Sequence, residues 1–511
     1  MPRSGDAGDC VAYATRRCRP LTQTASLHSV NHGLIRLRRL FSLTPHDTAS
    51  EAGRSLERYR RAALTSGATA IGRGVGLVAT LISVPLTIGY LGAERYGIWM
   101  TISSVIALLG FADLGLGNGL LNAIATAHGR DDRGVARSCV SSAFFLLAGL
   151  AALLAVMFAL CYPSIPWHRL FNVSADVGRQ EAGPAMAVFF GCFLLGLPLG
   201  IVSRIQMGYQ QGFMNAVWQA VGSLLTLACL LIAIWMRASL PMLVLALAGA
   251  PLLANAFNSA MLFGRTMPWL TPRWSAASWQ AGRQLGQSGF MFLILQLTAT
   301  LTSSADNLIV AQSLGPSAVA HLAVPARLFA VVSALVIIAL MPLWPAYGEA
   351  IARGDVPWVQ RTVVRSTVLA ALVSVATVAP IVVFGKAIIR AWAGADIDPS
   401  QSLLLALGCW TVLSTVGTSV SMFLNASNAI AFQVVCGIAV GLTATAIKTY
   451  TGVAYGGAGI IWTTNICYGL FALLPIAVAM PAILRQEHEM HTRRDSPCRH
   501  VDTAARVRPI T

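Results

Sequence analysis

Residues 138–161 read SCVSSAFFLLAGLAALLAVMFALC, a stretch of membrane-spanning length without one charged side chain. Lipid offers no water to satisfy backbone groups, so an apolar run of about 20 residues crosses a bilayer as a helix. Such runs recur along the chain, and the sequence predicts an all-α polytopic membrane protein. Twelve spans are expected, at 67–91, 97–119, 138–161, 184–204, 215–236, 240–264, 288–312, 318–345, 363–385, 402–424, 428–450 and 457–480.

The composition agrees with a membrane protein. Of 511 residues, 56% are hydrophobic and 11% are charged, whereas soluble domains carry roughly 25% charged residues. Much of the net charge of +16 lies in the two tails, as the positive-inside rule and anionic headgroups favour, so we do not expect nucleic-acid binding. The expected segments are a basic, disordered cytoplasmic arm (1–62), an N-terminal six-helix bundle (63–264), a cytoplasmic connecting loop (265–287), a C-terminal six-helix bundle (288–484) and a basic cytoplasmic tail (485–511).

Loop charges predict the orientation. With the N-terminus inside, ten arginines fall in the predicted cytoplasmic loops and six basic residues fall in the outer loops. This bias favours twelve spans with both termini in the cytoplasm.

A short internal echo predicts two related halves. Leu91-Gly92 after the first span resembles Leu314-Gly315 after the seventh, at an offset of 223 residues. Six helices per half restore the same orientation, so the halves would be parallel repeats about an axis along the membrane normal, with the substrate path between them.

Polar side chains form stripes within three spans. The first span carries Arg73, Gly76, Thr80, Ser83 and Thr87 at steps of three and four residues, which place them on one helix face. The seventh carries Gln296, Thr300, Ser303 and Asn307, and the tenth carries Trp410, Ser414, Gly417 and Ser421. Small and hydroxylated residues also serve close helix packing, so we expect packing for Gly76, Thr80 and Gly417 and a hydrated cavity wall for the seventh span.

Four ionisable residues lie well inside the ends of the predicted spans: Arg73, Asp113, Asp306 and Arg327. Spans one and two would turn near residue 93, and spans seven and eight near 316, so each acid lies at about the depth of an arginine on the neighbouring helix. Each pair is either a structural ion pair or an electropositive site for an anionic substrate. The candidate cavity residues are Arg73, Thr80, Asp113, Gln296, Thr300, Ser303, Asp306, Asn307, Arg327 and Trp410.

Motifs for catalysis and cofactors are absent from the sequence. No GxxxxGK[ST] loop for ATP occurs, and ten cysteines without a CxxC pair give no zinc site or disulfide framework. No nucleophile, base and orienting group gather in one loop. We therefore expect no cofactor, no metal and no enzymatic activity.

The first hairpin resembles a known family. Residues 90–99 (YLGAERYGIW), followed by 111–117 (FADLGLG), look like the first hairpin of bacterial polysaccharide-transport proteins, and Ser313-Leu314-Gly315 is similar to their second-half hairpin. The Ala320-His321 segment departs from the Tyr-Gly usual there, and the arginine-rich arm is not part of the pattern. These proteins belong to the multidrug/oligosaccharidyl-lipid/polysaccharide exporter superfamily.

The resemblance implies a flippase for undecaprenyl-pyrophosphate-linked oligosaccharide repeat units, used in surface or extracellular polysaccharide synthesis. It implies two six-helix bundles around a central cavity, alternating access, and a bacterial inner-membrane location. The implied partners are the lipid-linked oligosaccharide, membrane lipids, and a polysaccharide polymerase with its assembly proteins. Two alternatives stay open: a cation-coupled drug or metabolite antiporter of the same fold, and a membrane polysaccharide polymerase or ligase.

Overall fold

The computed structural model describes residue 44 and residues 50–109, 111–167, 176–314, 316–393, 398–427 and 429–495. The chain divides into two units, Met1–Arg60 and Arg61–Thr511. In the first unit, Glu51 begins helix α2 (Glu51–Leu109), and Glu57 and Arg60 form an ion pair of 2.7 Å one turn apart. Residues 51–62, predicted as part of a disordered arm, are therefore helical, while residues 1–43 and 45–49 lie outside the described residues.

The second unit is helical throughout the part of the chain that the structure describes. After α2 come the following helices and short 3₁₀ or π turns: α3 (Leu116–Gly129), α4 (Arg133–Cys161), η1 (Tyr162–Ser164), α6 (Asp176–Leu199), α7 (Ile201–Gly208), α8 (Gly212–Trp235), α9 (Leu240–Val244), η2 (Leu245–Gly249), α10 (Ala250–Met261), η3 (Leu262–Thr266), η4 (Pro268–Leu270), η5 (Trp274–Ala276), α11 (Trp279–Leu314), α12 (Pro316–Leu340), α13 (Leu343–Ala352), α14 (Val356–Ala393), α15 (Gln401–Ala426), α16 (Ile430–Tyr468), η6 (Gly469–Leu473) and α17 (Leu474–Asp495).

Eight helical segments within the described residues are long and apolar enough to cross a membrane, so the chain is a polytopic membrane protein as predicted. The last of them, Ile430–Glu487, contains a reversal. Gly456 in α16 has φ 63° and ψ −156°, and the hydroxyls of Thr451 and Thr463 lie 2.8 Å apart. In a straight helix these two residues would be about 18 Å apart. The segment is therefore a helical hairpin, which agrees with the two spans predicted there.

A similar argument shows that the chain also reverses direction within α2, although α2 has no break in its helical structure. Arg61 donates a hydrogen bond to the carbonyl of Tyr209, and the Tyr90 hydroxyl donates to the carbonyl of Ala238, so α2 follows the full length of α8. A straight helix would carry Leu109 about 70 Å from Arg61. Yet α3, which begins only a few residues later, packs on α7 next to Tyr209. The chain therefore turns back between Tyr90 and Leu109, around the predicted position.

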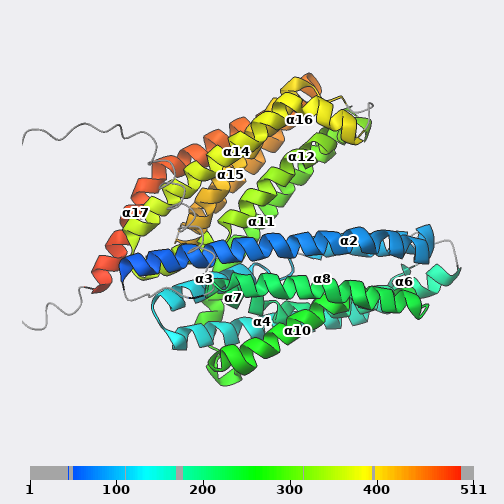
Figure 1. Ribbon diagram of the computed structural model, residues 1–511, viewed down its shortest axis with the longest axis horizontal. Helices are drawn as coiled ribbons and strands as arrows, with labels where there is room; N and C mark the ends of the chain where they lie inside the picture. Colours follow the sequence, from blue (N-terminus) through cyan, green and yellow to red (C-terminus); the bar gives the residue numbers. More distant parts are fainter. Residues whose placement is uncertain are drawn as a thin grey trace, which may run out of the picture. The chain divides into compact units, whose positions relative to one another are not determined.

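The helices of this unit form two bundles (Figure 1). Helices α3, α4, α6, α7, α8 and α10 pack on one another, and α11, α12, α14, α15, α16 and α17 pack on one another. The connection between them differs from the predicted loop 265–287, because α11 already begins at Trp279. This connection lies on α4, where the hydroxyls of Ser141 and Ser142 accept hydrogen bonds from the amides of Arg273 and Ser278.

The described contacts between the bundles gather at one end, which we call the closed end; it carries residues 129–133, 209–212 and 352–356. There the Ser66 hydroxyl donates to the carbonyl of Ala339 at 3.5 Å, and the Trp344 indole donates to the Asn122 side chain at 2.6 Å. Gly115, at φ 74°, lies so close to the carbonyl of Gly289 that any side chain would clash. The glycines at the start of α3 therefore allow it to lie close to α11.

The structure supports the predicted internal repeat. Helices α3 and α13 end, and α4 and α14 begin, at the predicted offset of 223 residues. The residues after α3 and α13, Asp131 and Gly354, both have positive φ. The next amides, of Asp132 and Asp355, donate equivalent hydrogen bonds back into their helices, each 2.9 Å long. Helices α3 and α13 also pack on each other, as expected of equivalent elements beside a pseudo-twofold axis.

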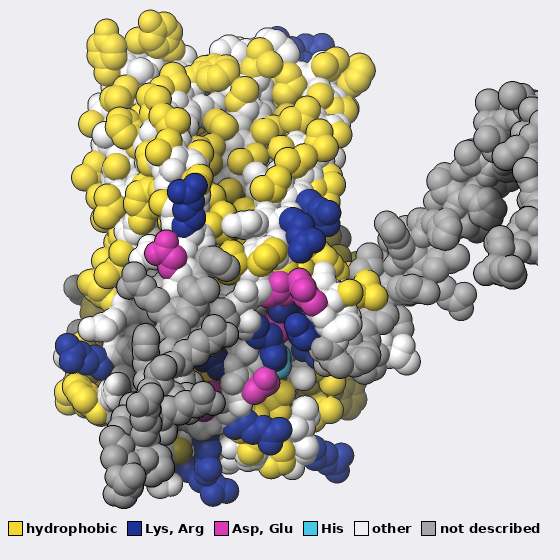
Figure 2. All heavy atoms as spheres, turned by 90° about the vertical axis from the view of Figure 1, so that its left-hand side faces the viewer, with side chains coloured by type: hydrophobic (Ala, Val, Ile, Leu, Met, Phe, Trp, Pro, Cys, Tyr) yellow, Lys and Arg dark blue, Asp and Glu magenta, His cyan; other side chains and the backbone are white. Residues whose placement is uncertain are grey.

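Charged and apolar surfaces are segregated. Figure 2 shows hydrophobic side chains covering the upper part of the view, while most of the Lys, Arg, Asp and Glu side chains lie in its lower half. Long aliphatic side chains are exposed on the bundle helices, among them Leu160, Leu231, Leu372 and Leu442. Such surfaces suit contact with lipid.

Candidate functional site

The N-terminal bundle contains a polar cavity of about 360 Å³, called here the N-terminal cavity. Its wall includes Thr80 and Ser83 from the predicted stripe of α2, with Gln219 from α8 and Asn255 from α10. The Thr80 hydroxyl donates to the carbonyl of Gly76 at 2.8 Å, so its lone pairs are left to the cavity. Thr80, one of the candidate cavity residues, thus lies on a cavity wall together with Gly76, for which helix packing was expected.

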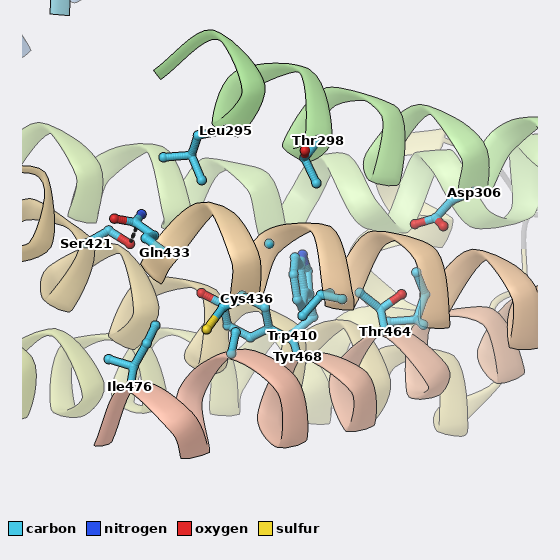
Figure 3. A pocket seen from close by; sticks show the side chains of 14 residues that line it. Leu295, Thr298, Asp306, Trp410, Ser421, Gln433, Cys436, Thr464, Tyr468 and Ile476 are labelled. Carbon is cyan, nitrogen blue, oxygen red and sulfur yellow. Dashed lines mark hydrogen bonds between the residues drawn. The ribbon is translucent and has the colours of Figure 1, made fainter. Parts of the chain in front are cut away.

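The C-terminal bundle contains a second cavity, of about 320 Å³, called here the C-terminal cavity (Figure 3). Three helices supply its polar groups: α11 gives Thr298 and Asp306, α15 gives Ser421, and α16 gives Gln433 and Thr464. Apolar side chains make up much of the remaining wall, together with the aromatic rings of Trp410 and Tyr468. Of the residues predicted for the seventh span, now α11, Asp306 lines this cavity, whereas Gln296 and Thr300 do not.

Asp306 forms an ion pair with Lys448 of α16, and the Nζ to Oδ1 distance is 2.5 Å. The Lys448 side chain is fully buried, and that of Asp306 is 16% exposed. The predicted pairing of Asp306 with Arg327 is wrong, because α16 packs along α11 and places Lys448 beside Asp306. Sequence reasoning missed Lys448, although a lone lysine near the end of an apolar run signals a partner or a function.

Asp113 lies beside Arg204 of α7 rather than Arg73. Asp113 Oδ2 and Arg204 Nε both lie 2.9 Å from the position a Cβ on Gly117 would occupy, so the two charges face each other across this glycine. Asp113 Oδ1 also accepts the amide of Gly115 at 3.0 Å, which fixes the turn before α3. The predicted pair with Arg73 is wrong, since depth alone does not tell which of several neighbouring helices supplies the partner.

Arg73 is exposed on α2. Ser66, Arg73 and Thr80 are seven residues apart and share one helix face. Because Ser66 contacts Ala339 of α12, this face is turned toward the C-terminal bundle. Arg73 therefore follows Ser66 by about 10 Å along the side of α2 that faces the other bundle.

The remaining predicted residues are scattered. Arg327 and Thr300 are exposed, on α12 and α11 respectively. Gln296 is half-buried on α11, and Trp410 is half-buried in the C-terminal cavity. Ser303 and Asn307 belong to α11, but their side chains lie outside the described part of the structure. A substrate-binding role for the ten candidate residues stays a prediction.

A polar network that the sequence analysis did not identify joins the bundles at the closed end. Arg353, which follows the last residue of α13, binds Asp131 in the other bundle at 3.2 Å and Glu349 of α13 at 2.5 Å. Glu349 also accepts a hydrogen bond of 3.3 Å from Gln210. We call Asp131, Gln210, Glu349 and Arg353 the closed-end network.

His128 at the end of α3 lies among these charges, and its ring is 5.0 Å from that of Tyr209. Burial lowers the pKa of His128, with Glu349 and Asp131 opposing the shift and Arg61 and Arg353 adding to it. Burial likewise raises the pKa of Tyr209 to about 12, against the opposing charge of Arg133. The closed end thus keeps both rings neutral at physiological pH.

Comparison with known proteins agrees with this architecture. The sequence model of the family described as polysaccharide biosynthesis protein matches residues 62–350. No curated protein matches the chain significantly.

Several solved transporters share the fold. A MATE crystal structure in the bent conformation is 18% identical, with a TM-score of 0.71 over 84% of this chain and 97% of that one. An outward-facing multidrug resistance MATE transporter of the MOP superfamily is 16% identical, with a TM-score of 0.70 over 83% and 95%. A MOP superfamily transporter from Pyrococcus furiosus, described as having a binding pocket of reverse polarity, is 15% identical, with a TM-score of 0.69 over 83% and 96%.

Proposed function

Because this chain belongs to the polysaccharide biosynthesis protein family and has the fold of MOP superfamily transporters, we propose that it is a flippase for lipid-linked oligosaccharides. Its substrate is an undecaprenyl-pyrophosphate-linked repeat unit, which it moves across the bacterial inner membrane for surface or extracellular polysaccharide synthesis. A charged sugar head could not cross the lipid core unaided, because its desolvation would be too costly.

The observation that carries this proposal is the pair of polar cavities in two bundles joined at one end. Both bundles offer hydroxyl and amide groups within membrane-spanning helices. Arg73 adds a positive charge on the side of α2 that faces the other bundle. A phosphorylated head could lie between the bundles, with its prenyl chain remaining in lipid.

The arginine-rich segments at 130–137 and 353–365 favour a cytoplasmic position for the closed end. The bundles would then be open toward the periplasm, after release of the substrate. Return to the cytoplasm-facing state requires the closed-end network to break and the opposite ends to approach. A polysaccharide polymerase and its assembly proteins would take up the released product.

The antiporter alternative has less support. A cation-coupled exchanger needs a carboxylate available to its ion, whereas the intramembrane acids described here, Asp113 and Asp306, each face a basic side chain. A polymerase or ligase has less support still, since the described residues gather no catalytic group in a large loop.

Flipping can be measured directly in liposomes that contain the purified full-length chain and a fluorescent lipid-linked oligosaccharide in both leaflets. A membrane-impermeant quencher should bleach nearly all of the label when the protein is present, and only the outer leaflet when it is absent. In a deletion strain, lipid-linked repeat units should accumulate on the cytoplasmic side. Unchanged surface polysaccharide in that strain, together with no scrambling in liposomes, would refute the proposal.

A further inference from the structure

We infer that the C-terminal cavity binds a neutral, hydroxyl-rich ring, that is, one sugar of the transported head. This inference rests on the proposed function and assigns a part of the substrate to a defined place. The argument depends on which hydrogen-bonding groups the wall leaves without partners, on its net charge and on its aromatic faces.

The wall is rich in acceptors. The Gln433 amide donates from Nε2 to the Ser421 hydroxyl at 3.0 Å, while its Oε1 has no partner among the described residues, although the side chain is only 9% exposed. Asp306 uses Oδ1 for Lys448, so its second oxygen remains an acceptor. Thr464 donates its proton to the carbonyl of Ile460 at 3.0 Å and keeps its lone pairs. A ligand that satisfies this wall must bring several donors.

The donors need not carry charge. Lys448 neutralises Asp306 from a fully buried position and is not itself part of the cavity wall. A ligand ammonium would have to compete with a lysine that is already in place at 2.5 Å. Hydroxyl groups can donate to Gln433 and to the free oxygen of Asp306 without disturbing that pair. The chemistry therefore favours a polyol over a cation.

Two aromatic rings supply the flat apolar part of the site. Trp410 and Tyr468 stand edge to face with ring centres 5.3 Å apart, and both line the cavity, as Figure 3 shows. Tyr468 reaches this position because Gly417 lacks a side chain; a Cβ there would collide with the Tyr468 hydroxyl. A sugar ring has apolar C–H faces and hydroxyl edges, which match aromatic walls with a few polar groups.

A prenyl chain fits this wall less well. It would fill the apolar part, but it would also cover the acceptors of Asp306 and Gln433 without donating to them, which is costly. The volume of about 320 Å³ is at the lower end of ligand-sized pockets and suits one or two rings rather than a long chain.

The test is thermal unfolding of the full-length protein in nanodiscs, with methyl glycosides of a hexose, a deoxyhexose and an N-acetylhexosamine as probes. We expect at least one glycoside to raise Tm by roughly 1–2 °C at about tenfold its Kd, and to raise it further with the logarithm of its concentration. The rise should vanish in Gln433→Leu and persist in Gln401→Leu, an exposed glutamine of the same bundle. If Gln433→Leu does not fold, Trp410→Leu replaces it, with Trp462→Leu as the control.

Three results would overturn the inference: no response to any glycoside, a response to farnesol that is equal in wild type and Gln433→Leu, or a response to ethanolamine that grows in Lys448→Met. The liposome assay keeps the two proposals apart. Glycoside binding without lipid scrambling would refute the flippase and keep the sugar site. Scrambling without glycoside binding would refute the sugar site alone.

Discussion

Replacing Lys448 with methionine tests the energetic role of the buried ion pair. Methionine keeps the length and the apolar stem of lysine but removes its charge. The variant leaves Asp306 in α11 with a carboxylate that is 16% exposed and has lost its cation. Removing one partner of a buried pair typically costs about 3–5 kcal/mol, because the other charge stays buried without compensation.

Protonation sets an upper limit on this cost. The orphaned carboxyl can take a proton at a cost of about 1.36 kcal/mol for each pH unit above an ordinary pKa near 3.9. The limit is therefore about 4 kcal/mol at pH 7 and about 1.5 kcal/mol at pH 5. We expect Lys448→Met to lower Tm by several degrees at pH 7 and by much less at pH 5.

Thermal unfolding in nanodiscs at both pH values measures this effect, and Lys386→Met is the matched control. Lys386 pairs with Asp398 at 3.7 Å, with both side chains about half exposed, and such surface pairs contribute about 0–1 kcal/mol. The double variant Lys448→Met, Asp306→Asn should recover most of the stability. The reasoning fails if both lysine variants behave alike, or if the Lys448→Met effect does not depend on pH.

Three further predictions concern the closed end and the reversal of α16. Arg353→Gln should loosen the closed-end network and lengthen the distance between spin labels on α4 and α14, while Arg361→Gln, on the surface of α14, should leave it unchanged. Gly456→Ala should lower the free energy of unfolding by about 1–3 kcal/mol, since φ 63° with ψ −156° is open almost only to glycine. Gly457→Ala is the control: a Cβ there meets ordinary contacts of 3.7 Å, so its Tm should be nearly that of the wild type. Burial lowers the pKa of His128, so on acidification this histidine is protonated in the unfolded chain before it is protonated in the folded one. Stability should therefore fall as pH drops below about 6.5. His128→Phe should flatten that part of the profile of Tm against pH, and an unchanged slope would contradict this role of His128.

Much of the fold was predictable because lipid constrains the sequence so strongly. Apolar runs of spanning length mark helices, and the predicted spans in α8 and α15 agree with these helices to within three residues at each end. Helix α14 extends well beyond its predicted span at both ends, because its polar ends leave the apolar run. The repeat was visible only as a dipeptide echo, because helix packing preserves geometry while allowing almost any apolar side chain. In the structure the repeat is recognisable from the matching ends of α3 and α13 and from the positive φ that Asp131 and Gly354 share.

The partners of the charged residues were not predictable in the same way. Depth along a helix follows from counting residues, but which helix lies opposite depends on how the bundle is assembled. Asp306 therefore meets Lys448 of α16 and not Arg327 of α12, and Asp113 meets Arg204 of α7. The closed-end network was missed because its members are spread over short interhelical segments and helix ends, where polar residues usually face water.

The packing of α3 on α13 carries a consequence for how such a chain arose. Residues close to the repeat offset meet there, since Asn122 contacts Trp344, the neighbour of its equivalent Pro345. A half-length ancestor would therefore have paired with an identical copy across the same surface. In such a homodimer every substitution would change both sides of the interface at once. Fusion of two such copies would remove this restriction. The ion pair of Asp131 with Arg353, and glycine at Gly354 where a symmetric copy would require a second acid, are asymmetries that a fused chain permits.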